Sequence, residues 1–404
     1  MKSVCSNEEC TSCMACYAAC PAGAIRIGKD GQGFYRPVID PAKCIGCRRC
    51  VAVCPAHGHL RKNEPKKAIA AYAKNKALRA ASTSGGAFSA VAAYILSQGG
   101  VVFGAAFDEE FVVRHQYVDR LEDLGKLRVS KYVQSYVGDS FRQAKEFLVA
   151  GRSVFFTGTP CQINGLKNFL RKDYENLLTA DIVCHGVPSS SLFAAYLKRI
   201  EENCSSGIKN VRFRYKTREY KHSGIECLYN MKIMLYNGKE YLKKVNEDPY
   251  LRAFFSDLCL NPACFSCQFA TKERPGDLTL ADFWGFKAPS LDWVDTGKGI
   301  SLVLLNTGKG ENIFREASSV LKWLERPLEE AIAGNPHLSH PIFRDEKYDE
   351  FWQDYRAHGY AYVEKKYFSP IPPANADDSA VVKLKKSIPP HVKYVLKKML
   401  GKDQ

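Results

Sequence analysis

Eight of the 16 cysteines fall into two runs of identical spacing near the N-terminus. Each run reads C-x2-C-x2-C-x3-C-P, and the runs are Cys10, Cys13, Cys16 and Cys20-Pro21, then Cys44, Cys47, Cys50 and Cys54-Pro55. Bacterial iron–sulfur proteins use this spacing to hold two cubanes, and the fourth cysteine of each run binds the other cluster. The pattern therefore predicts two [4Fe-4S] clusters, one on Cys10, Cys13, Cys16 and Cys54 and the other on Cys44, Cys47, Cys50 and Cys20.

A pair of tetrahedral zinc sites is the alternative for these cysteines. Zinc sites take four ligands per ion from paired C-x2-C knuckles, and nothing in that chemistry requires the x2-x2-x3-Pro run. Between the two runs, the apolar stretches 25–27 and 34–39 are separated by Gly31 and Gly33, which predicts a β-hairpin. We interpret residues 1–60 as a small α+β, bacterial-type two-cluster ferredoxin domain.

Two further cysteines follow predicted strands. The strand 153–156 runs into Thr159, which can cap a helix, and Pro160, which suits its first turn, so Cys161 lies at a helix N-terminus that favours a thiolate. The next strand, 177–183, ends at Cys184. Because the two strands flank one helix, they should be parallel, and both cysteines should lie at the carboxyl edge of the sheet, where α/β proteins bind ligands.

Cys264 and Cys267 form a C-x2-C pair, which with Cys161 and Cys184 supplies four thiolates for a third cluster. The alternative joins this pair to Cys259 and one further cysteine, a grouping that matches plant-type [2Fe-2S] spacing. Spacing alone leaves both groupings open. Cys204 and Cys227 are interpreted as buried apolar residues.

A glycine-rich turn, 82–86, precedes a predicted helix over 87–96, with Ser84 as its N-cap. Glycines at a helix N-terminus leave backbone N–H groups open to an anion. A capped helix with a flexible entry is the plainer interpretation. The pattern continues with predicted strands at 101–107 and 111–118 and a helix at 139–150, and Pro188 is expected to open another helix.

The composition is that of an ordinary globular protein, because 46% of the 404 residues are hydrophobic and 25% are charged. It excludes a largely disordered chain. No signal-like h-region and no run of 18 apolar residues occurs, so we expect a cytoplasmic protein. The formal net charge of +15 favours anionic partners. The basic segment 61–79 has little aromatic interleaving, so nucleic-acid binding is not expected.

The expected organisation has five parts. The head, 1–60, is followed by a basic solvated linker with an entry strand, 61–79, and by an α/β body with a mixed sheet and flanking helices, 80–290. A helical cover, 291–368, includes expected helices around 322–324 and 351–355. A linker and basic amphipathic tail, 369–404, could bind an anionic membrane or pack on its own domain.

Six segments of the body occur together: Ser84-Gly85-Gly86, Ser130-Lys131-Tyr132, 157–162, 181–189, Cys264-x2-Cys267 and Asp282-Phe283-Trp284-Gly285. In combination they resemble the coenzyme F420 hydrogenase/dehydrogenase beta-subunit family over about residues 65–290. The resemblance implies an FAD-binding iron–sulfur oxidoreductase whose flavin exchanges single electrons with clusters and a hydride with an organic substrate. Members reduce coenzyme F420, plant and cyanobacterial relatives reduce a chlorophyll intermediate, and bacterial members with a fused ferredoxin head resemble those among polysaccharide-biosynthesis genes.

The resemblance also implies site residues. It puts the flavin against Ser84, Gly85, Gly86, Ser130, Lys131, Gly158, Thr159 and Pro160, and the body cluster on Cys161, Cys184, Cys264 and Cys267. Cys259 then has no role. The sequence departs from the family pattern at Ala281, where glycine is usual, and at Asn261, where arginine often stands.

Lys131 and His185 are the candidate catalytic residues. Lys131 could stabilise an anionic reduced flavin and His185 could donate a proton beside it, although a solvated lysine and a structural histidine are the plainer interpretations. We expect electrons to pass from a ferredoxin or another low-potential partner through the [4Fe-4S] clusters to FAD, and a hydride to pass to a deazaflavin-like or other small anionic substrate, with glycan precursors among the candidates. An electron-relay subunit without its own substrate is the main alternative, and a basic iron–sulfur nucleic-acid protein is a weaker one.

Overall fold

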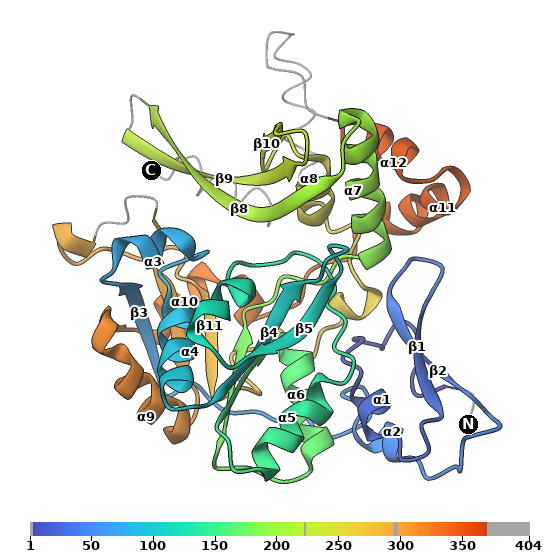
Figure 1. The fold of residues 1–404 in the computed structure, drawn as a ribbon, viewed down its shortest axis with the longest axis horizontal. Helices are drawn as coiled ribbons and strands as arrows, with labels where there is room; N and C mark the ends of the chain where they lie inside the picture. Colours follow the sequence, from blue (N-terminus) through green and yellow to red (C-terminus); the bar gives the residue numbers. More distant parts are fainter. Residues whose placement is uncertain (1–2, 222–223, 294–297, 370–404) are drawn as a thin grey trace.

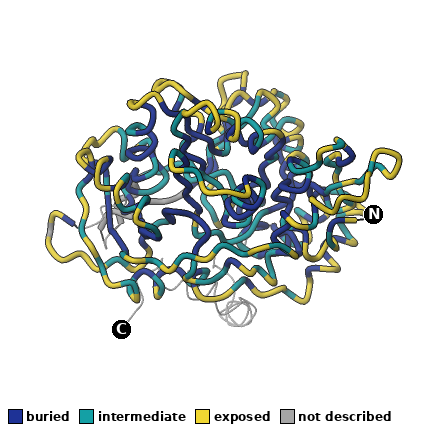
Figure 2. Tube along the Cα trace, turned by 90° about the horizontal axis from the view of Figure 1, so that it is seen from below, coloured by how far each residue is buried: buried dark blue, intermediate teal, exposed yellow. Residues whose placement is uncertain are grey.

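The computed structural model describes residues 3–221, 224–293 and 298–369. Figure 1 shows a small head beside a large sheet, and a second layer of strands and helices above that sheet. The buried parts of the chain trace lie mainly in the interior, whereas the outer loops, including those near the N-terminus, are exposed (Figure 2).

An eight-stranded sheet organises the body, with the order β13-β3-β12-β11-β7-β6-β4-β5. Its strands are β3 (Lys67–Ala73), β4 (Val101–Phe107), β5 (Val113–Val118), β6 (Val154–Gly158), β7 (Leu177–Ile182), β11 (Leu278–Asp282), β12 (Ser301–Leu305) and β13 (Leu321–Arg326). Four consecutive strands, β11, β7, β6 and β4, run parallel, and the strands on either side of them pair antiparallel. The predicted mixed sheet is therefore confirmed, including the parallel pairing of β6 with β7.

Helices cover both faces of the sheet, since parallel strands need crossover connections. They are α3 (Lys76–Ala81), α4 (Ala87–Ser97), α5 (Ser140–Val149), α6 (Pro160–Leu170), α9 (Gly308–Ala317) and α10 (Leu328–Gly334). Val102 and Phe155 pack in one apolar cluster with α4 and α9, whereas their chain neighbours Val101 and Val154 pack in another with α5 and α6. Alternate side chains point to opposite faces of a strand, so these strands are apolar along their whole length.

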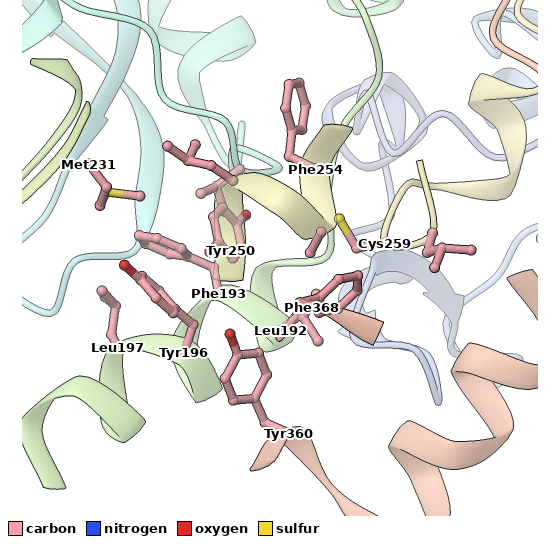
Figure 3. Close-up of a cluster of buried hydrophobic side chains, with 14 of the residues drawn as sticks. Leu192, Phe193, Tyr196, Leu197, Met231, Tyr250, Phe254, Cys259, Tyr360 and Phe368 are labelled. Carbon is pink, nitrogen blue, oxygen red and sulfur yellow. The ribbon is translucent and has the colours of Figure 1, made fainter. Parts of the chain in front are cut away.

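The second layer packs around buried aromatic residues. Its elements are α7 (Ser190–Cys204), β8 (Ile208–Lys221), β9 (Gly224–Leu235), β10 (Glu240–Lys244), α8 (Pro249–Phe255), α11 (Tyr348–His358) and α12 (Tyr360–Tyr367). Figure 3 shows Phe193, Tyr196, Tyr250 and Tyr360 gathered from α7, α8 and α12. The Tyr196 hydroxyl donates to Asp248 Oδ2 at 2.7 Å, which satisfies a buried polar group inside this cluster.

The head consists of α1 (Ala15–Ala19), β1 (Ile25–Lys29), β2 (Tyr35–Ile39) and α2 (Arg49–Ala52). Strands β1 and β2 pair antiparallel, as the predicted hairpin requires. Short 3-10 turns complete the described elements: η1 (Leu121–Leu127), η2 (Pro262–Cys264), η3 (Leu291–Trp293), η4 (Ser318–Val320) and η5 (Pro336–Leu338). No helix among the described residues is long and apolar enough to cross a membrane.

Several sequence expectations were wrong. The segment 61–79 contains the expected entry strand, but this strand is not solvated, because β3 lies inside the sheet between β12 and β13 and is mostly buried. The segment around Trp323 is strand β13 rather than a helix, since it pairs with β3. Ser84 does not cap α4: the N-cap is Gly86, and the Ser84 hydroxyl donates to the Ile300 carbonyl at 2.8 Å.

Two further expectations concern the positions of helices. The helix expected at Pro188 begins at Ser190, because the Ser189 side chain accepts the Leu192 N–H and caps it. The helix expected around 351–355 is confirmed as α11. The expected tail lies outside the described residues, apart from residue 369.

A buried ion pair holds the carboxyl ends of β7 and β11 together. The guanidinium of Arg274 lies 2.7 Å from Asp181, and the two side chains are 1% and 0% exposed. Arg274 also donates to the Ile182 carbonyl, and Asp181 accepts from the Gly276 N–H and the Thr279 hydroxyl. The pair thus ties the loop before β11 to the end of β7.

We expect Arg274→Met to lower the free energy of unfolding by about 3–5 kcal/mol, because it leaves the Asp181 carboxylate buried without its counter-charge. The matched control is Arg315→Met, which removes an exposed arginine paired with Glu311 and should cost less than about 1 kcal/mol. Urea unfolding of both variants measures the difference. Equal destabilisation by the two substitutions would contradict a special role for the buried pair.

Candidate functional site

The first group of head thiols surrounds a small cavity of about 20 Å³. Its cysteines are Cys10, Cys13, Cys16 and Cys54, together with Cys5. Burial is the main cause that raises the pKa of the Cys16 thiol, and the charges of Cys10 and Cys54 add to it. The structure therefore brings together the four cysteines predicted for the first cluster, drawn from both runs.

The second group lines a separate cavity, also of about 20 Å³, whose cysteines are Cys20, Cys44, Cys47 and Cys50. The two runs also have the same local conformation: Met14 before α1 and Arg48 before α2 are both left-handed, with φ of 62° and 56°. This backbone turn carries the third cysteine of each run into the first turn of a short helix. The crossed grouping is thus the arrangement that the spacing predicts.

Cys5 is a residue that the sequence analysis did not assign. Its side chain hydrogen-bonds Cys10 and Cys54, and these bonds raise the pKa of the Cys5 thiol. The hydrogen bond from Cys5 is the main cause that lowers the pKa of Cys10 to about 6. Cys5 is outside both repeated runs, so the spacing carried no signal for it.

The four body cysteines gather at the carboxyl edge of the sheet. Cys161 follows the N-cap Thr159 at the start of α6, Cys184 follows β7, and Cys264 ends η2, three residues before Cys267. Burial raises the pKa of Cys184, and the charges of Cys161 and Cys267 raise it further. The same causes act on Cys264, whose pKa is raised by burial and then by the charges of Cys184, Cys267 and Cys161.

The expectation that the start of α6 favours a thiolate at Cys161 was wrong. Burial raises the pKa of Cys161 to about 11, even though the Thr159 hydroxyl lies 3.1 Å from its Sγ and lowers the pKa. Desolvation of the charged form outweighs the helix terminus here. A bound metal would deprotonate such a thiol, which makes ligation dependent on pH.

Cys259 lies apart from this group. It is fully buried in the aromatic cluster of the second layer, where Figure 3 shows it near Phe254 and Phe368. Burial, then the charge of Asp257, raises its pKa, and no other thiol contributes. The geometry therefore favours the grouping with Cys161 and Cys184 over the grouping with Cys259. Cys204 is half-buried at the end of α7, and the side chain of Cys227 is outside the described residues.

The first head cavity touches the body directly. The Thr11 side chain hydrogen-bonds Cys161, and the charge of Cys161 contributes to the raised pKa of Cys13. Helix α6 approaches the head closely at Gly165, where an added Cβ would lie 3.1 Å from the Cys13 Sγ and 3.2 Å from the Ala15 Cβ. A larger residue at this position would push the head away from α6.

Arg36 of the head lies against Asn261 of the body. Asn261 is fully buried, and its amide nitrogen donates to the Cys10 carbonyl at 3.2 Å. The Arg36 guanidinium of the head reaches the same place, donating to Cys10 O at 2.6 Å and to Asn261 Oδ1 at 3.4 Å, while Asp30 pairs with it at 2.7 Å. A guanidinium from the head thus contacts the Asn261 side chain and the Cys10 carbonyl together.

A large cavity of about 700 Å³ opens beside these thiols. Residues from the head, from both ends of the sheet and from the second layer line it. They include Thr11, Ser12, Ser84, Gly86, Ser130, Lys131, Gly158, Thr159, Cys184, His185 and Ala281. Because Thr11 and Ser12 also line the first thiol cavity, the large cavity and that thiol group share a wall. The volume is in the usual range for a cofactor or small-molecule site.

Two residues predicted for the flavin do not line this cavity. Gly85 packs against the sheet: an added Cβ would lie 2.2 Å from the Ala71 carbonyl and 2.7 Å from the Ser301 nitrogen. Pro160 is buried in the first turn of α6. Neither residue therefore faces the cavity.

Lys131 lines the cavity without an acidic partner among its hydrogen bonds. Its Nζ donates to the carbonyls of Arg128 at 2.7 Å and Lys126 at 3.0 Å. Burial lowers the pKa of Lys131 to about 7, since the charged ammonium loses water and gains no counter-charge. The site can therefore accept an anion that restores the charge.

His185 belongs to a chain of three polar side chains. Its Nε2 lies 2.6 Å from Asp257 Oδ1 and its Nδ1 lies 3.0 Å from His337 Nε2. A carboxylate only accepts, so Nε2–H of His185 donates to Asp257, and the direction of the hydrogen bond between His185 Nδ1 and His337 Nε2 depends on the tautomers of the two rings. Burial, then the charge of His185, lowers the pKa of His337 to about 3. His337 and Asp257 carried no spacing signal, because neither is close to His185 in sequence.

A second series of hydrogen-bonded side chains supports the cavity wall at Thr157–Thr159. His115 Nε2–H donates to the Thr157 carbonyl at 3.1 Å, and His115 Nδ1 lies 2.9 Å from the Ser135 hydroxyl. Gln162 donates to Ser135 at 3.0 Å and accepts the Thr159 N–H at 2.9 Å. Burial lowers the pKa of His115 to about 4, so this ring stays neutral and its tautomer is determined by the carbonyl.

Three family models match the chain. Residues 151–330, which include all four body cysteines, match the model that describes the C terminus of the coenzyme F420 hydrogenase/dehydrogenase beta subunit. Residues 9–57 and 36–83 match two models that are each described as "4Fe-4S dicluster domain". No group of three or more His, Cys, Asp or Glu side chains in the described part of the chain is arranged around a single metal ion, whereas a [4Fe-4S] cluster takes its four thiolates on four irons. The dicluster matches confirm the predicted two-cluster head.

Among solved structures, the chain is similar to a chain of the xenon-derivatised F420-reducing [NiFe] hydrogenase complex from Methanosarcina barkeri. The two are 16% identical, the match covers 75% of this chain and 91% of that chain, and the TM-score is 0.44. No curated protein matches the sequence. The family matches and the cysteine pattern agree: residues 151–330 are similar to the C terminus of the coenzyme F420 hydrogenase/dehydrogenase beta subunit, and a 4Fe-4S dicluster domain lies on the N-terminal side of this region.

Proposed function

We propose that this protein is an iron–sulfur flavoprotein oxidoreductase with three [4Fe-4S] clusters and one FAD. Electrons would pass between a ferredoxin-like or other low-potential partner, the head clusters, a body cluster on Cys161, Cys184, Cys264 and Cys267, and the flavin. A small anionic organic substrate would exchange a hydride with the flavin. Flavin supplies the conversion between one-electron and two-electron chemistry.

The observation that carries this proposal is that residues of the body thiol group and of the head line the same large cavity. Cys184 of the body group and Thr11 of the head both line it, and so do six of the eight residues that the family resemblance assigns to flavin. A redox cofactor in this cavity would therefore lie next to two groups of thiols. An isolated ligand pocket would not need such neighbours.

The residues present fit a flavin. Gln134 lines the cavity and is 3% exposed, and within the described residues its Nε2 has no hydrogen-bond partner, although its Oε1 accepts the Tyr35 N–H at 2.8 Å. An unmatched buried donor is costly, and a carbonyl oxygen of a flavin ring is a suitable acceptor. At the other side of the cavity, Gly86 and Ala87 begin α4, whose N-terminus suits a pyrophosphate.

Lys131 and His185 are the proposed catalytic residues. Lys131 Nζ would hold its proton beside an anionic ring or phosphate, since burial leaves it otherwise uncompensated. His185 is oriented by Asp257 and by His337, so a proton on its ring would be kept at a defined position at the cavity wall. The proposed substrate is anionic because the protein carries a net charge of +15.

The third cluster can be tested by iron content. After anaerobic reconstitution we expect about 12 iron atoms per chain, and about 8 in Cys264→Ser, because a cubane holds four irons on four thiolates. Cys259→Ser is the matched control and should keep about 12, since this thiol is buried in the aromatic cluster. Loss of iron in both variants would support the alternative grouping with Cys259, and loss of iron in Cys259→Ser alone would contradict the proposed ligand set.

The flavin can be tested by extraction and by reoxidation. We expect one noncovalent FAD per chain in the acid supernatant, and we expect Gln134→Met, which removes the unmatched donor, to lower FAD affinity by about tenfold, the value of one hydrogen bond in a buried site. Reduced protein should then be reoxidised by a suitable acceptor, for which coenzyme F420 is the first probe. Flavin that is reduced and reoxidised only through a partner protein would indicate the electron-relay alternative, and a protein that takes up no flavin would contradict the proposal.

Lys131 makes FAD binding dependent on pH. At pH 8 the lysine is mostly neutral without an anion, so anionic FAD should draw about one proton onto it on binding, and almost none at pH 6, where it is already charged. FAD affinity should therefore fall as the pH rises from 7 to 9. Calorimetry in buffers of different ionisation enthalpy measures the uptake, and Lys131→Met should abolish both the uptake and the pH slope. An unchanged uptake in that variant would exclude Lys131 as the responsible group.

A further inference from the structure

The two thiol groups of the head differ in what surrounds them. The first group, Cys10, Cys13, Cys16 and Cys54, is buried, and its cavity shares Thr11 and Ser12 with the large cavity of the body. In the second group, Cys47 is exposed and Cys20 and Cys44 are half-buried. Figure 1 shows the segment between β2 and α2 at the outer end of the head, away from the large sheet.

The surface around the second group is basic and has one large apolar residue. Lys43, Arg48 and Arg49 are exposed, and Arg48 and Arg49 line the second cavity together with Ile45. Ile45 is 69% exposed, although isoleucine is among the residue types most often buried. We name Lys43, Ile45, Arg48 and Arg49 the outer head surface.

Little on this surface neutralises its positive charge. Lys43 lies 3.9 Å from Asp40, with side chains that are 65% and 43% exposed, so water screens this pair strongly. The three basic side chains can offset the negative charge that a thiolate-ligated cluster would bring to the second cavity. An apolar residue within a ring of like charges, beside a redox group, is suited to brief docking of an oppositely charged protein.

We propose that the outer head surface is the docking site of an acidic one-electron carrier protein, and that the second head cluster is the point where electrons enter or leave the chain. The proposal rests on the proposed function. In each encounter the carrier gives up one electron and the second cluster gains it. Two encounters supply the two electrons of one flavin reduction, and the protons come from solvent. The first group then serves as the inner relay, because it adjoins Cys161.

The test measures binding of a plant-type [2Fe-2S] ferredoxin, used as an acidic one-electron probe. Its Kd is determined by calorimetry with the holoprotein between low and physiological salt. We expect the double variant Arg48→Glu/Arg49→Glu to raise Kd at least tenfold at low salt and to weaken the salt dependence, since charge complementarity acts mainly on encounter. Arg48→Lys/Arg49→Lys should keep most of the affinity.

The matched control is Lys209→Glu/Lys243→Glu, which makes the same change in net charge on exposed positions of β8 and β10 in the second layer. It should leave Kd nearly unchanged. An equal loss of affinity in the control would show attraction to the net charge of the protein, and an unchanged Kd in the arginine reversal would exclude this docking surface. Iron content is measured for every variant, and Lys43→Glu, outside the cysteine run, replaces the arginine reversal if that variant loses iron.

A separate measurement distinguishes this proposal from the proposed function. Dithionite reduces both the clusters and the flavin without a protein carrier, so it reports whether the redox groups of a variant are reducible independently of docking. Flavin reduction by dithionite in a variant that no longer binds the ferredoxin supports both proposals. Tight ferredoxin binding at the outer head surface by a chain that takes up no flavin would leave the docking site in place and contradict the proposed function.

Discussion

The ion pair between Asp181 and Arg274 connects the two chain segments on which the body thiol group depends. Asp181 belongs to β7, which ends just before Cys184, and Arg274 belongs to the loop that follows Cys267. Arg274 also lowers the pKa of Cys184 and Cys267, against the larger effect of burial. Since both charges are fully buried, neither segment can move away without exposing an unpaired charge to the apolar interior. The edge of the parallel sheet and the loop before β11 are therefore held at a fixed position relative to each other.

The head depends on buried polar contacts rather than on a long linker. Arg36 joins the Cys10 carbonyl to Asn261, and Gln134 accepts the Tyr35 N–H, so the first cysteine run and strand β2 of the head are each bonded to the body. These bonds hold Thr11 against Cys161 and Met14 against the N–H of Gly138. A relay between the head and the body needs such a constant separation, because electron transfer depends on how far apart the redox groups lie.

Burial favours the neutral forms of three basic side chains that line the large cavity, although the protein as a whole is basic. Lys131 loses much of its tendency to be charged through burial, and His337 and His115 are held neutral by the same cause. Because few charges in the cavity are compensated, most of their electrostatic stabilisation would come from a bound ligand. An anionic cofactor with a polar ring would supply the counter-charge to Lys131 and an acceptor for Gln134.

The amino-acid sequence by itself determined the head and the parallel unit of the body. The two cysteine runs predicted the crossed thiol groups because ligand spacing is a local property, and the βαβ pattern predicted the shared sheet edge of Cys161 and Cys184 because crossover handedness leaves one arrangement. Only the tertiary structure decided which further thiols lie beside Cys161 and Cys184. Spacing leaves open whether the Cys264–Cys267 pair joins Cys161 and Cys184 or joins Cys259, and the burial of Cys259 among distant aromatic residues separates the two groupings.

Other parts of the site were also decided by contacts between distant residues. Strand β3 was expected in a solvated segment, and the residues around Trp323 were expected to be helical, but these two segments pair with each other across about 250 residues of chain, a pairing that no local pattern encodes. His337 and Asp257 reach His185, and Gln134 reaches Tyr35, for the same reason. Spacing and periodicity report neighbours along the chain, whereas these groups become neighbours only when the sheet brings its edges and its loops together.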